Sequence, residues 1–530
     1  MAPPDEVWWR RGSIYEIYPR SFQDSDGDGV GDLAGIERRL DHLVHLGVDA
    51  IWIAPFFPSP MKDFGYDVAD YCAVDPLFGT MDDFEQLLAA AHGRGLKLIT
   101  DFVLNNTSDT HAWFVESRAS RANAKRDWYI WRDPAADGGP PNDWLSIFGG
   151  PAWRLDQASG QYFLHSFLSC QPDLNWRNPA VEAAMFDVLR FWMDRGVDGF
   201  RLDALWMIAK DDQFRDNPPN PDWHEGMIPY LVRTPVYSGD RPEAIEICRR
   251  MRVLADSYPG DRVLIGETYL PIARLMAYYG AKGDGLHLPF NFKLIQTPWK
   301  ASEIHEIIRR YDGALPPGAQ PNWVLGNHDN PRVASRVGGL EPARAAAVLL
   351  LTLRGTPTLY YGEELGLADV DIPPGREQDP RAVTEPGFGR DPERTPMPWS
   401  ADPNAGFTTG DPWLPLTTDW AADNVEIQAA DPDSTLNLYR RLLTLRRAEP
   451  ALYAGSFTLL DLQGEAIAYL REGDDGRRFL VVLNLSGEPG RYQAEVGGRI
   501  VLGTRRAREG GMASGAIALG PHEAVVVALG

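Results

Sequence analysis

Three acidic residues stand directly after, or at the end of, short apolar segments. Asp203 ends "DGFRLD", Glu267 lies in "RVLIGET", and Asp329 lies in "NWVLGNHD". No serine–histidine or cysteine–histidine pair accompanies them. Such carboxyl groups are typical of glycoside chemistry, in which one acid protonates the leaving oxygen and another attacks the anomeric carbon or activates water. A single acid is more often a solvated residue or part of a structural ion pair, but three in equivalent places favour catalysis.

Basic and acidic neighbours strengthen this interpretation. Arg201 precedes Asp203 by two residues, so the alternation of a strand puts both side chains on one face. A cation there favours the ionised form of Asp203 and lowers its pKa. His328 adjoins Asp329, and Asp101 lies near the end of another apolar segment.

Eight strands, each followed by a helical pattern, predict a (β/α)8 barrel, an α/β TIM barrel with insertions. The expected strands cover residues 13–19, 50–55, 97–103, 198–203, 262–268, 286–292, 322–329 and 357–364. The expected helices cover residues 33–46, 82–92, 179–195, 243–257, 272–279, 302–311, 342–353 and 434–447. In such a barrel the working residues lie at the C-terminal ends of the strands, which is where the three acids fall.

Two stretches do not fit the barrel repeat. The connection after the third strand is far longer than an ordinary βα loop, and the pattern after about residue 456 changes to short alternating strands with Gly-rich turns. We therefore expect a catalytic barrel at 1–104 and 172–447, an inserted subdomain B at 105–171, and a C-terminal antiparallel β-sandwich domain at 448–530.

Composition limits the partners. The formal charge of −22 disfavours polyanions, so no nucleic-acid partner is expected. The sequence has neither an apolar run of membrane-spanning length nor a secretory signal, which predicts no membrane association and a cytoplasmic location. Cys72, Cys170 and Cys248 are widely spaced, as expected of unpaired thiols in a reducing compartment.

The stretch "ITDFVLNNTSDTH" has two interpretations. Asn105 and Asn106 begin two overlapping N-glycosylation sequons, but they also follow the third expected strand, where active-site residues are expected. Because no secretion is expected, the glycan interpretation is the weaker one.

Several segments together resemble the α-amylase family, glycoside hydrolase family 13. They are "DFVLNNTSDTH", "QPDLNW", "GFRLDA", "IGET" and "GNHDN", in this order. The segments "WWRRGSIYEIYPRSFQDSDGDGVGDLAGI" and "GRDPERTPMPW" are similar to its α-glucosidase and oligo-1,6-glucosidase branch. The resemblance covers essentially the whole chain.

The resemblance implies a role for each acid. Asp203 would be the nucleophile that forms a covalent glucosyl ester, Glu267 the acid that later acts as base, and Asp329 the residue that binds sugar hydroxyls and stabilises the transition state. The configuration of the product would be retained. The implied substrate-binding set around the terminal glucose consists of Tyr66, Asp67, Asn106, Arg201, His328 and Arg394.

Asn106 departs from the family pattern. The family usually has histidine here, which hydrogen-bonds the terminal glucose, whereas the shorter amide of Asn106 carries no charge. We expect a working site with glucose binding weaker by about 1 kcal/mol, the net worth of one hydrogen bond.

Ala204, directly after the proposed nucleophile, favours α-1,4 links, because Val at this position in the branch resembles enzymes with α-1,6 preference. The expected function is therefore a retaining, exo-acting α-glucosidase that releases glucose from short substrates such as maltose. Transfer of glucose to other acceptors uses the same ester, so a glucosyltransferase or a sucrose or maltose isomerase stays open. A catalytically impaired sugar-binding relative also stays open.

The loop "DSDGDGVGD" has the spacing of a calcium-binding loop. Asp24, Asp26, Asp28 and Asp32 would offer carboxylate oxygens and Val30 its carbonyl oxygen. The acidic residue that normally closes such a loop is missing. We expect a structural Ca²⁺ site, with Mg²⁺ as a second possibility, and the alternative is a simple acidic turn.

Overall fold

Eight parallel strands form the barrel that the sequence predicts. In the computed structural model, which describes residues 7–385 and 387–530, they follow one another in the order β10, β9, β8, β7, β3, β2, β1 and β11. A parallel bridge between Val324 and Thr358 closes the ring. The strands are β1 (Ile14–Ile17), β2 (Ala50–Ile53), β3 (Lys97–Val103), β7 (Gly199–Asp203), β8 (Val263–Gly266), β9 (Leu288–Asn291), β10 (Asn322–Trp323) and β11 (Thr358–Tyr360). The first six residues of the expected barrel domain lie outside the described residues.

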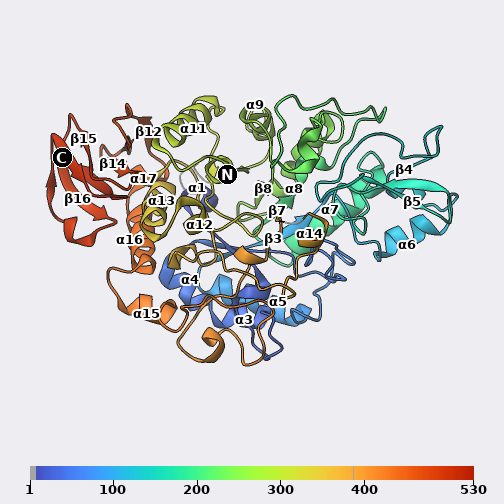
Figure 1. Cartoon of the computed structure of the whole chain (residues 1–530), viewed down its shortest axis with the longest axis horizontal. Helices are drawn as coiled ribbons and strands as arrows, with labels where there is room; N and C mark the ends of the chain where they lie inside the picture. Colours follow the sequence, from blue (N-terminus) through green and yellow to red (C-terminus); the bar gives the residue numbers. More distant parts are fainter. Residues whose placement is uncertain (1–6, 386) are drawn as a thin grey trace.

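Helices follow the strands at the expected places (Figure 1). The α-helices are α1 (Trp8–Arg11), α2 (Pro19–Phe22), α3 (Leu33–Arg38), α4 (Leu40–Leu46), α5 (Met81–Gly93), α6 (Ala112–Ala119), α7 (Pro179–Asp194), α8 (Pro242–Asp256), α9 (Ile272–Leu275), α10 (Lys293–Gln296), α11 (Ala301–Ala314), α12 (Val333–Val337), α13 (Leu340–Thr352), α14 (Pro380–Thr384), α15 (Val425–Ala430), α16 (Thr435–Ala448) and α17 (Pro450–Tyr453). The barrel prediction is confirmed.

Two expected helices are interrupted. The single helix expected at 33–46 breaks at Arg39, which has φ −104° and ψ 4° between α3 and α4. The Arg39 side chain bonds Gln23 at 2.5 Å and lies over the Trp399 ring at 4.3 Å, so long-range contacts fix the break. The helix expected at 272–279 is α9 followed by a 3-10 turn, Met276–Tyr279.

The barrel interior explains why its strands read as nearly continuous apolar runs. Ile14, Trp52, Ile99, Ile265 and Phe290 come from five different strands and pack in one buried cluster. The opposite face of each strand packs against the surrounding helices in a second, larger cluster. Strands buried on both faces have no need of polar residues at every second position.

The long connection after β3 carries a small antiparallel sheet of its own. Its strands are β4 (Trp131–Arg132), β5 (Trp153–Asp156) and β6 (Gln161–Leu164), with β6 in the middle. Together with α6 they lie at one end of the long axis of the molecule, opposite the C-terminal strands (Figure 1). The exact limits drawn from the sequence for this subdomain stay predictions.

The C-terminal strands form a six-stranded sheet, in the order β12, β13, β14, β19, β16 and β17, and a two-stranded sheet of β15 and β18. The two sheets share one apolar cluster. Arg471 ties this part to the barrel, because its buried guanidinium donates to the carbonyl oxygen of Thr352 at the end of α13 at 2.6 Å. The strands are β12 (Ser456–Leu459), β13 (Ala466–Glu472), β14 (Arg478–Asn484), β15 (Gly490–Gln493), β16 (Gly498–Gly503), β17 (Met512–Ala513), β18 (Ala516–Leu519) and β19 (Ala524–Leu529).

The described helices and cysteines are relevant to the location of the protein. Among the described residues, none of the helices combines the length and the apolar character needed to cross a bilayer. Cys170 and Cys248 are buried and Cys72 is half-buried, and all three are free thiols.

Candidate active site

One guanidinium group holds two of the predicted catalytic acids. Arg201, inside β7, contacts Asp203 Oδ1 through Nη1 at 2.5 Å and Glu267 Oε2 through Nη2 at 2.8 Å. Asp203 ends β7 and Glu267 directly follows β8, so adjacent parallel strands deliver both acids to the same end of the barrel. The structure brings together residues that the sequence separates by more than sixty positions.

A third carboxyl group shares this arginine. Asp101 on β3 is paired in register with Arg201 and accepts from its Nη1 at 3.0 Å. Burial raises the pKa of Asp101 to about 6, against the lowering effect of Arg201. Burial also raises the pKa of Asp203, while Arg201 lowers it and the charges of Glu267 and Asp101 raise it further. One cation among three carboxyl groups therefore leaves the pKa values of Asp101 and Asp203 raised.

The backbone fixes which oxygen of Glu267 is free. Oε2 accepts two hydrogen bonds, from the Ala204 N–H at 2.7 Å and from Arg201 Nη2 at 2.8 Å. Ala204 provides this N–H from a left-handed conformation, with φ 42° and ψ 33°. Oε1 makes neither of these two contacts and is therefore the oxygen on which a transferable proton can sit.

Asp329 has a different electrostatic environment. Its Oδ1 accepts from Arg390 Nη1 at 3.0 Å and from Arg394 Nη2 at 2.9 Å, and His328 Nε2 lies 3.3 Å from Oδ2. Burial favours the protonated form, but His328 and the two arginines outweigh it and hold the pKa of Asp329 well below its usual range. Asp329 is therefore held as an anion beside the Arg201 cluster.

Arg394 contacts Asp329. Arg390 of the same segment contacts Asp329 too, and the sequence analysis did not identify it. Arg390 bridges Asp329 and Asp63, which it contacts at 3.0 and 2.8 Å, and pairs with Asp379 at 2.8 Å. The signal available in the sequence was a second arginine four residues before Arg394 in "GRDPERTPMPW".

The assignment of Asp67 to sugar binding is not supported by its position. Its oxygens accept from the Ser59 hydroxyl at 2.8 Å and from the N–H groups of Lys62 and Asp63 at 3.1 and 3.0 Å, so it stabilises its own loop. Phe64 and the following glycine both have positive φ, and this tight reversal leaves Asp63 as the acid that faces Arg390. Asp63 is the residue that the sequence reasoning missed.

Tyr66 and His328 join the two parts of the site. The Tyr66 hydroxyl donates to Asp101 Oδ2 at 3.1 Å and lies 2.8 Å from His328 Nε2. The two rings are stacked, with centroids 5.3 Å apart and planes inclined by 12°. This contact connects the Arg201 cluster to Asp329.

Asn106 is buried at the end of β3 rather than exposed. Its side-chain Nδ2 donates to the backbone carbonyl oxygen of Tyr66 at 3.1 Å. The backbone carbonyl oxygen of Asn106 accepts from the Tyr71 hydroxyl at 2.7 Å. Asn105 and Asn106 are each 1% exposed, which leaves no room for a glycan on either side chain. The amide that was expected to bind glucose thus already holds the segment that carries Tyr66.

The acidic loop before α3 brings part of the predicted metal set together. One carboxylate oxygen from each of Asp24, Asp26 and Asp28 lies within 4.8 Å of the others. The Asp32 carboxylate instead caps the N-terminus of α3. Its oxygens accept hydrogen bonds from the N–H groups of Ser25 and Gly35, both at 2.7 Å. The Val30 N–H donates to Asp28 at 2.8 Å. Hard oxygen donors this close to one another fit a cation such as Ca²⁺.

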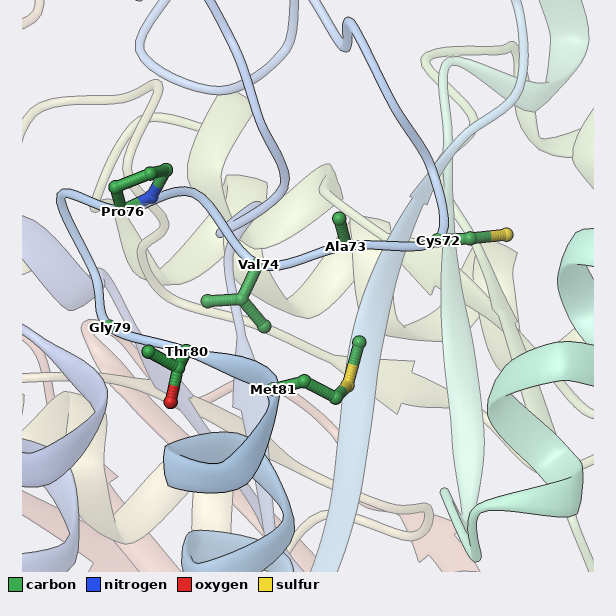
Figure 2. Close-up of a pocket in the computed structure, with 7 residues that line it drawn as sticks. All are labelled: Cys72, Ala73, Val74, Pro76, Gly79, Thr80 and Met81. Atoms are coloured by element: carbon green, nitrogen blue, oxygen red, sulfur yellow. The ribbon is translucent and has the colours of Figure 1, made fainter.

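A separate hollow of about 490 Å³ lies on the connection between β2 and α5. Its lining residues are Cys72, Ala73, Val74, Pro76, Gly79, Thr80 and Met81 (Figure 2). It contains no carboxyl group and no residue of the acid cluster, so it offers no glycoside chemistry.

The comparisons with known proteins agree with this geometry. The family model of the alpha-amylase catalytic domain matches residues 16–455. The chain belongs to the α-amylase family. A "Probable alpha-glucosidase" of Rhizobium meliloti is 44% identical over 507 residues, which cover 92% of this chain and 91% of that protein.

Two solved structures are also similar to the chain. The crystal structure of the alpha-glucosyl transfer enzyme XgtA has a TM-score of 0.93 at 44% identity and 99% coverage of both chains. The trehalulose synthase MutB of Pseudomonas mesoacidophila has a TM-score of 0.90 at 33% identity, with 100% of both chains covered. The proteins similar to this chain thus include a probable alpha-glucosidase, an alpha-glucosyl transfer enzyme and a trehalulose synthase.

We predict that Arg201→Gln destabilises the protein more at neutral than at acidic pH. Removing one partner of a buried ion pair costs about 3–5 kcal/mol, and here three carboxyl groups lose their cation. Their pKa values in the folded variant rise above those of the unfolded chain. The variant is therefore least impaired below about pH 4 and loses stability as the pH rises.

Urea denaturation at about pH 4.5 and about pH 7.5 measures this difference. Arg190→Gln, which alters an exposed pair with Asp187, is the matched control and should change the free energy of unfolding by less than about 0.5 kcal/mol at either pH. Equal losses for Arg201→Gln at both pH values would contradict the effect of Arg201 on the pKa values of Asp101 and Asp203.

Proposed function

We propose that this chain is a retaining, exo-acting α-glucosidase that releases glucose from short α-1,4-linked glucosides such as maltose. The observation that carries the proposal is the single Arg201 guanidinium that contacts both Asp203 and Glu267. Retaining enzymes need their two carboxyl groups about 5 Å apart, without room for an intervening water molecule, and a shared guanidinium favours such a short spacing.

The reaction follows from the positions of these two acids. Asp203 attacks the anomeric carbon while the proton on Glu267 Oε1 passes to the glycosidic oxygen, so the aglycone leaves as an alcohol. The product of this step is a glucosyl ester on Asp203. Glu267, now ionised, takes a proton from water, and the resulting hydroxide displaces Asp203 from the anomeric carbon. Two inversions release α-glucose and restore the proton to Glu267.

The remaining polar groups bind the terminal glucose. Asp329 is held as an anion by Arg390 and Arg394, so it can accept hydrogen bonds from two sugar hydroxyls and stabilise positive charge on the ring. Asp203 and Glu267 are 8% and 6% exposed, which supports a substrate that enters with one end only. The partners are small α-glucosides.

The free thiols support the expected cytoplasmic location. The charge of −22 supports the absence of a nucleic-acid partner.

Transfer of glucose to a sugar acceptor is a second candidate function, after hydrolysis, and a specific observation favours it. The similarity to an alpha-glucosyl transfer enzyme and to a trehalulose synthase supports reaction of the same ester with a sugar hydroxyl in place of water. The chemistry on Asp203 is unchanged in that case, and only the acceptor differs. A catalytically impaired relative would bind the sugar and form no ester.

We predict that the purified protein releases glucose from maltose, with little from isomaltose and sucrose, and that the first glucose is the α anomer. Chromatography of all products and proton NMR of the anomeric signals in the first minutes measure both results. Asp203→Asn, which removes the nucleophile and keeps the shape, is the control and should bind maltose without turnover.

The possible outcomes separate the alternatives. New disaccharides or trisaccharides would show that the enzyme catalyses transfer or isomerisation in place of hydrolysis. If the native protein bound maltose and formed no product, it would be a catalytically impaired sugar-binding relative. A first product in the β configuration would overturn the retaining mechanism itself.

We predict that Ala204→Val shifts preference toward isomaltose while lowering kcat on both substrates. The left-handed backbone of Ala204 tolerates a β-branched side chain poorly, at a cost of about 1–2 kcal/mol, and relaxing it displaces the N–H that holds Glu267. Rates with maltose and isomaltose give the ratio. Ala204→Gly keeps the N–H without strain and should leave the ratio unchanged. An unchanged ratio in Ala204→Val would count against Ala204 as a specificity residue.

We also propose that the loop of Asp24, Asp26 and Asp28 binds a structural Ca²⁺ ion, with the Val30 carbonyl and Asp32 as the remaining candidate ligands and Mg²⁺ as the alternative ion. Partial burial and the charges of Asp26 and Asp24 raise the pKa of Asp28, a cost that a bound cation removes. The loop is remote in sequence from every catalytic acid, so the ion would stabilise the fold without taking part in the reaction.

The metal proposal predicts a calcium-dependent Tm. Calcium at about one hundred times its Kd stabilises the folded state by about 2.7 kcal/mol, and chelation removes this gain. Replacing both Asp26 and Asp28 by Ala should abolish the calcium-dependent rise, whereas the surface variant Asp82→Ala should keep it. Differential scanning calorimetry measures these shifts in Tm. A native Tm that neither calcium nor magnesium changes would refute the metal site.

A further inference from the structure

Glu16 is a buried acid that the proposed mechanism does not use. It lies on β1 next to Trp52 of β2 in the strand register, and it is 0% exposed. Its Oε1 lies 2.5 Å from Nδ1 of His328, which is also 0% exposed. A carboxyl group in direct contact with a site histidine determines which ring nitrogen of that histidine carries the proton.

The surroundings of Glu16 favour its neutral form. Among the described residues, its Oε2 has no hydrogen-bond partner, and a buried carboxylate oxygen without a partner is costly. Burial raises the pKa of Glu16, an effect that Arg201 opposes and that Asp329 and Asp101 reinforce. Burial also lowers the pKa of His328, so the low-energy pair consists of a protonated acid and a neutral imidazole.

The contacts around a neutral His328 favour one direction for its hydrogen bonds. With a proton on Glu16, the carboxyl O–H donates to Nδ1, and the Nε2–H then points to the Tyr66 hydroxyl oxygen at 2.8 Å and to Asp329 Oδ2 at 3.3 Å. The Tyr66 hydroxyl in turn donates to Asp101 at 3.1 Å. With the opposite tautomer, a bare Nε2 lone pair would face the Asp329 carboxylate and repel it.

We propose that Glu16 is a positioning residue that donates a hydrogen bond to His328 and so fixes its Nε2–H tautomer. This inference rests on the proposed function, because the groups that His328 orients, Asp329 and Tyr66, are those proposed to line the site of the terminal glucose. Glu16 touches neither substrate nor a reacting atom. Its effect reaches the sugar through His328, which keeps Asp329 Oδ2 in place beside the two arginines that hold Oδ1.

A comparison of two substitutions tests this role. The amide of Glu16→Gln has the shape of a protonated carboxyl group and can donate to Nδ1, so its kcat/KM for maltose should stay within about twofold of the native value. Glu16→Leu offers no donor. The loss of this buried hydrogen bond should then raise KM by roughly tenfold, with a smaller change in kcat.

Glu364→Gln is the matched control. Glu364 is another buried acid bonded to a histidine, His42, at 2.9 Å, and it also accepts hydrogen bonds from the Tyr15 hydroxyl at 2.7 Å and the Gly362 N–H at 2.9 Å. Its substitution should leave KM unchanged. Equal impairment of Glu16→Gln and Glu16→Leu would show that the charge of Glu16 is required and would overturn the proposal. Native KM in Glu16→Leu would overturn it too.

A direct readout separates this inference from the proposed function. Long-range proton–nitrogen NMR of histidine-labelled protein, with the His328 signal assigned by a His328→Asn variant, reports the tautomer without any substrate. The native protein and Glu16→Gln should both show the Nε2–H form. A different tautomer refutes the role of Glu16 even if maltose is hydrolysed. The Nε2–H form in a protein that does not hydrolyse maltose refutes only the proposed function.

Discussion

The site depends on a single buried cation. Arg201 is 1% exposed and contacts Asp101, Asp203 and Glu267. Burying a guanidinium group is costly unless polar or acidic groups compensate its charge, and burying three acids together is costly without a cation. The barrel satisfies both requirements because neighbouring parallel strands end at one rim, so residues in equivalent positions along β3, β7 and the end of β8 meet at one point. Removing any member leaves the others with an uncompensated charge or an unsatisfied hydrogen bond, which ties the stability of the barrel to the composition of the site.

A second charge arrangement surrounds Asp329, and its residues come from loops instead of strands. Arg390 and Arg394 lie in the long segment before α15, and Asp63 lies in the loop after β2. These loops are held to each other by the ion pairs themselves, since Arg390 bridges Asp63 and Asp329. The strands therefore fix the geometry of the bond-breaking pair, while the loops build the groups proposed to recognise the sugar. In the proposed mechanism, loop replacement can change the substrate without disturbing the pair that breaks the bond.

This division explains what the sequence could predict. Strands buried on both faces produce apolar runs that are visible locally, so all eight were located, and an acid such as Asp203 at the end of a run marks the site. The pairing of Arg390 with Asp63 links positions more than three hundred residues apart, and no local pattern encodes it. The choice between Asp63 and Asp67 depends on a chain reversal at a non-glycine residue with positive φ, which composition does not reveal. The break at Arg39 likewise reflects a contact with Trp399, far away along the chain.

The same fold gives neighbouring carboxyl groups different electrostatic environments. Asp329 is contacted by two arginines and stays ionised. Asp203 shares one arginine with Glu267 and Asp101, and the charges of these two acids raise the pKa of Asp203. In the proposed mechanism, Glu267 gives its proton to the leaving oxygen as Asp203 loses its negative charge to the sugar. The number of cations that contact each acid therefore distinguishes the acid proposed to recognise sugar from the pair proposed to react with it.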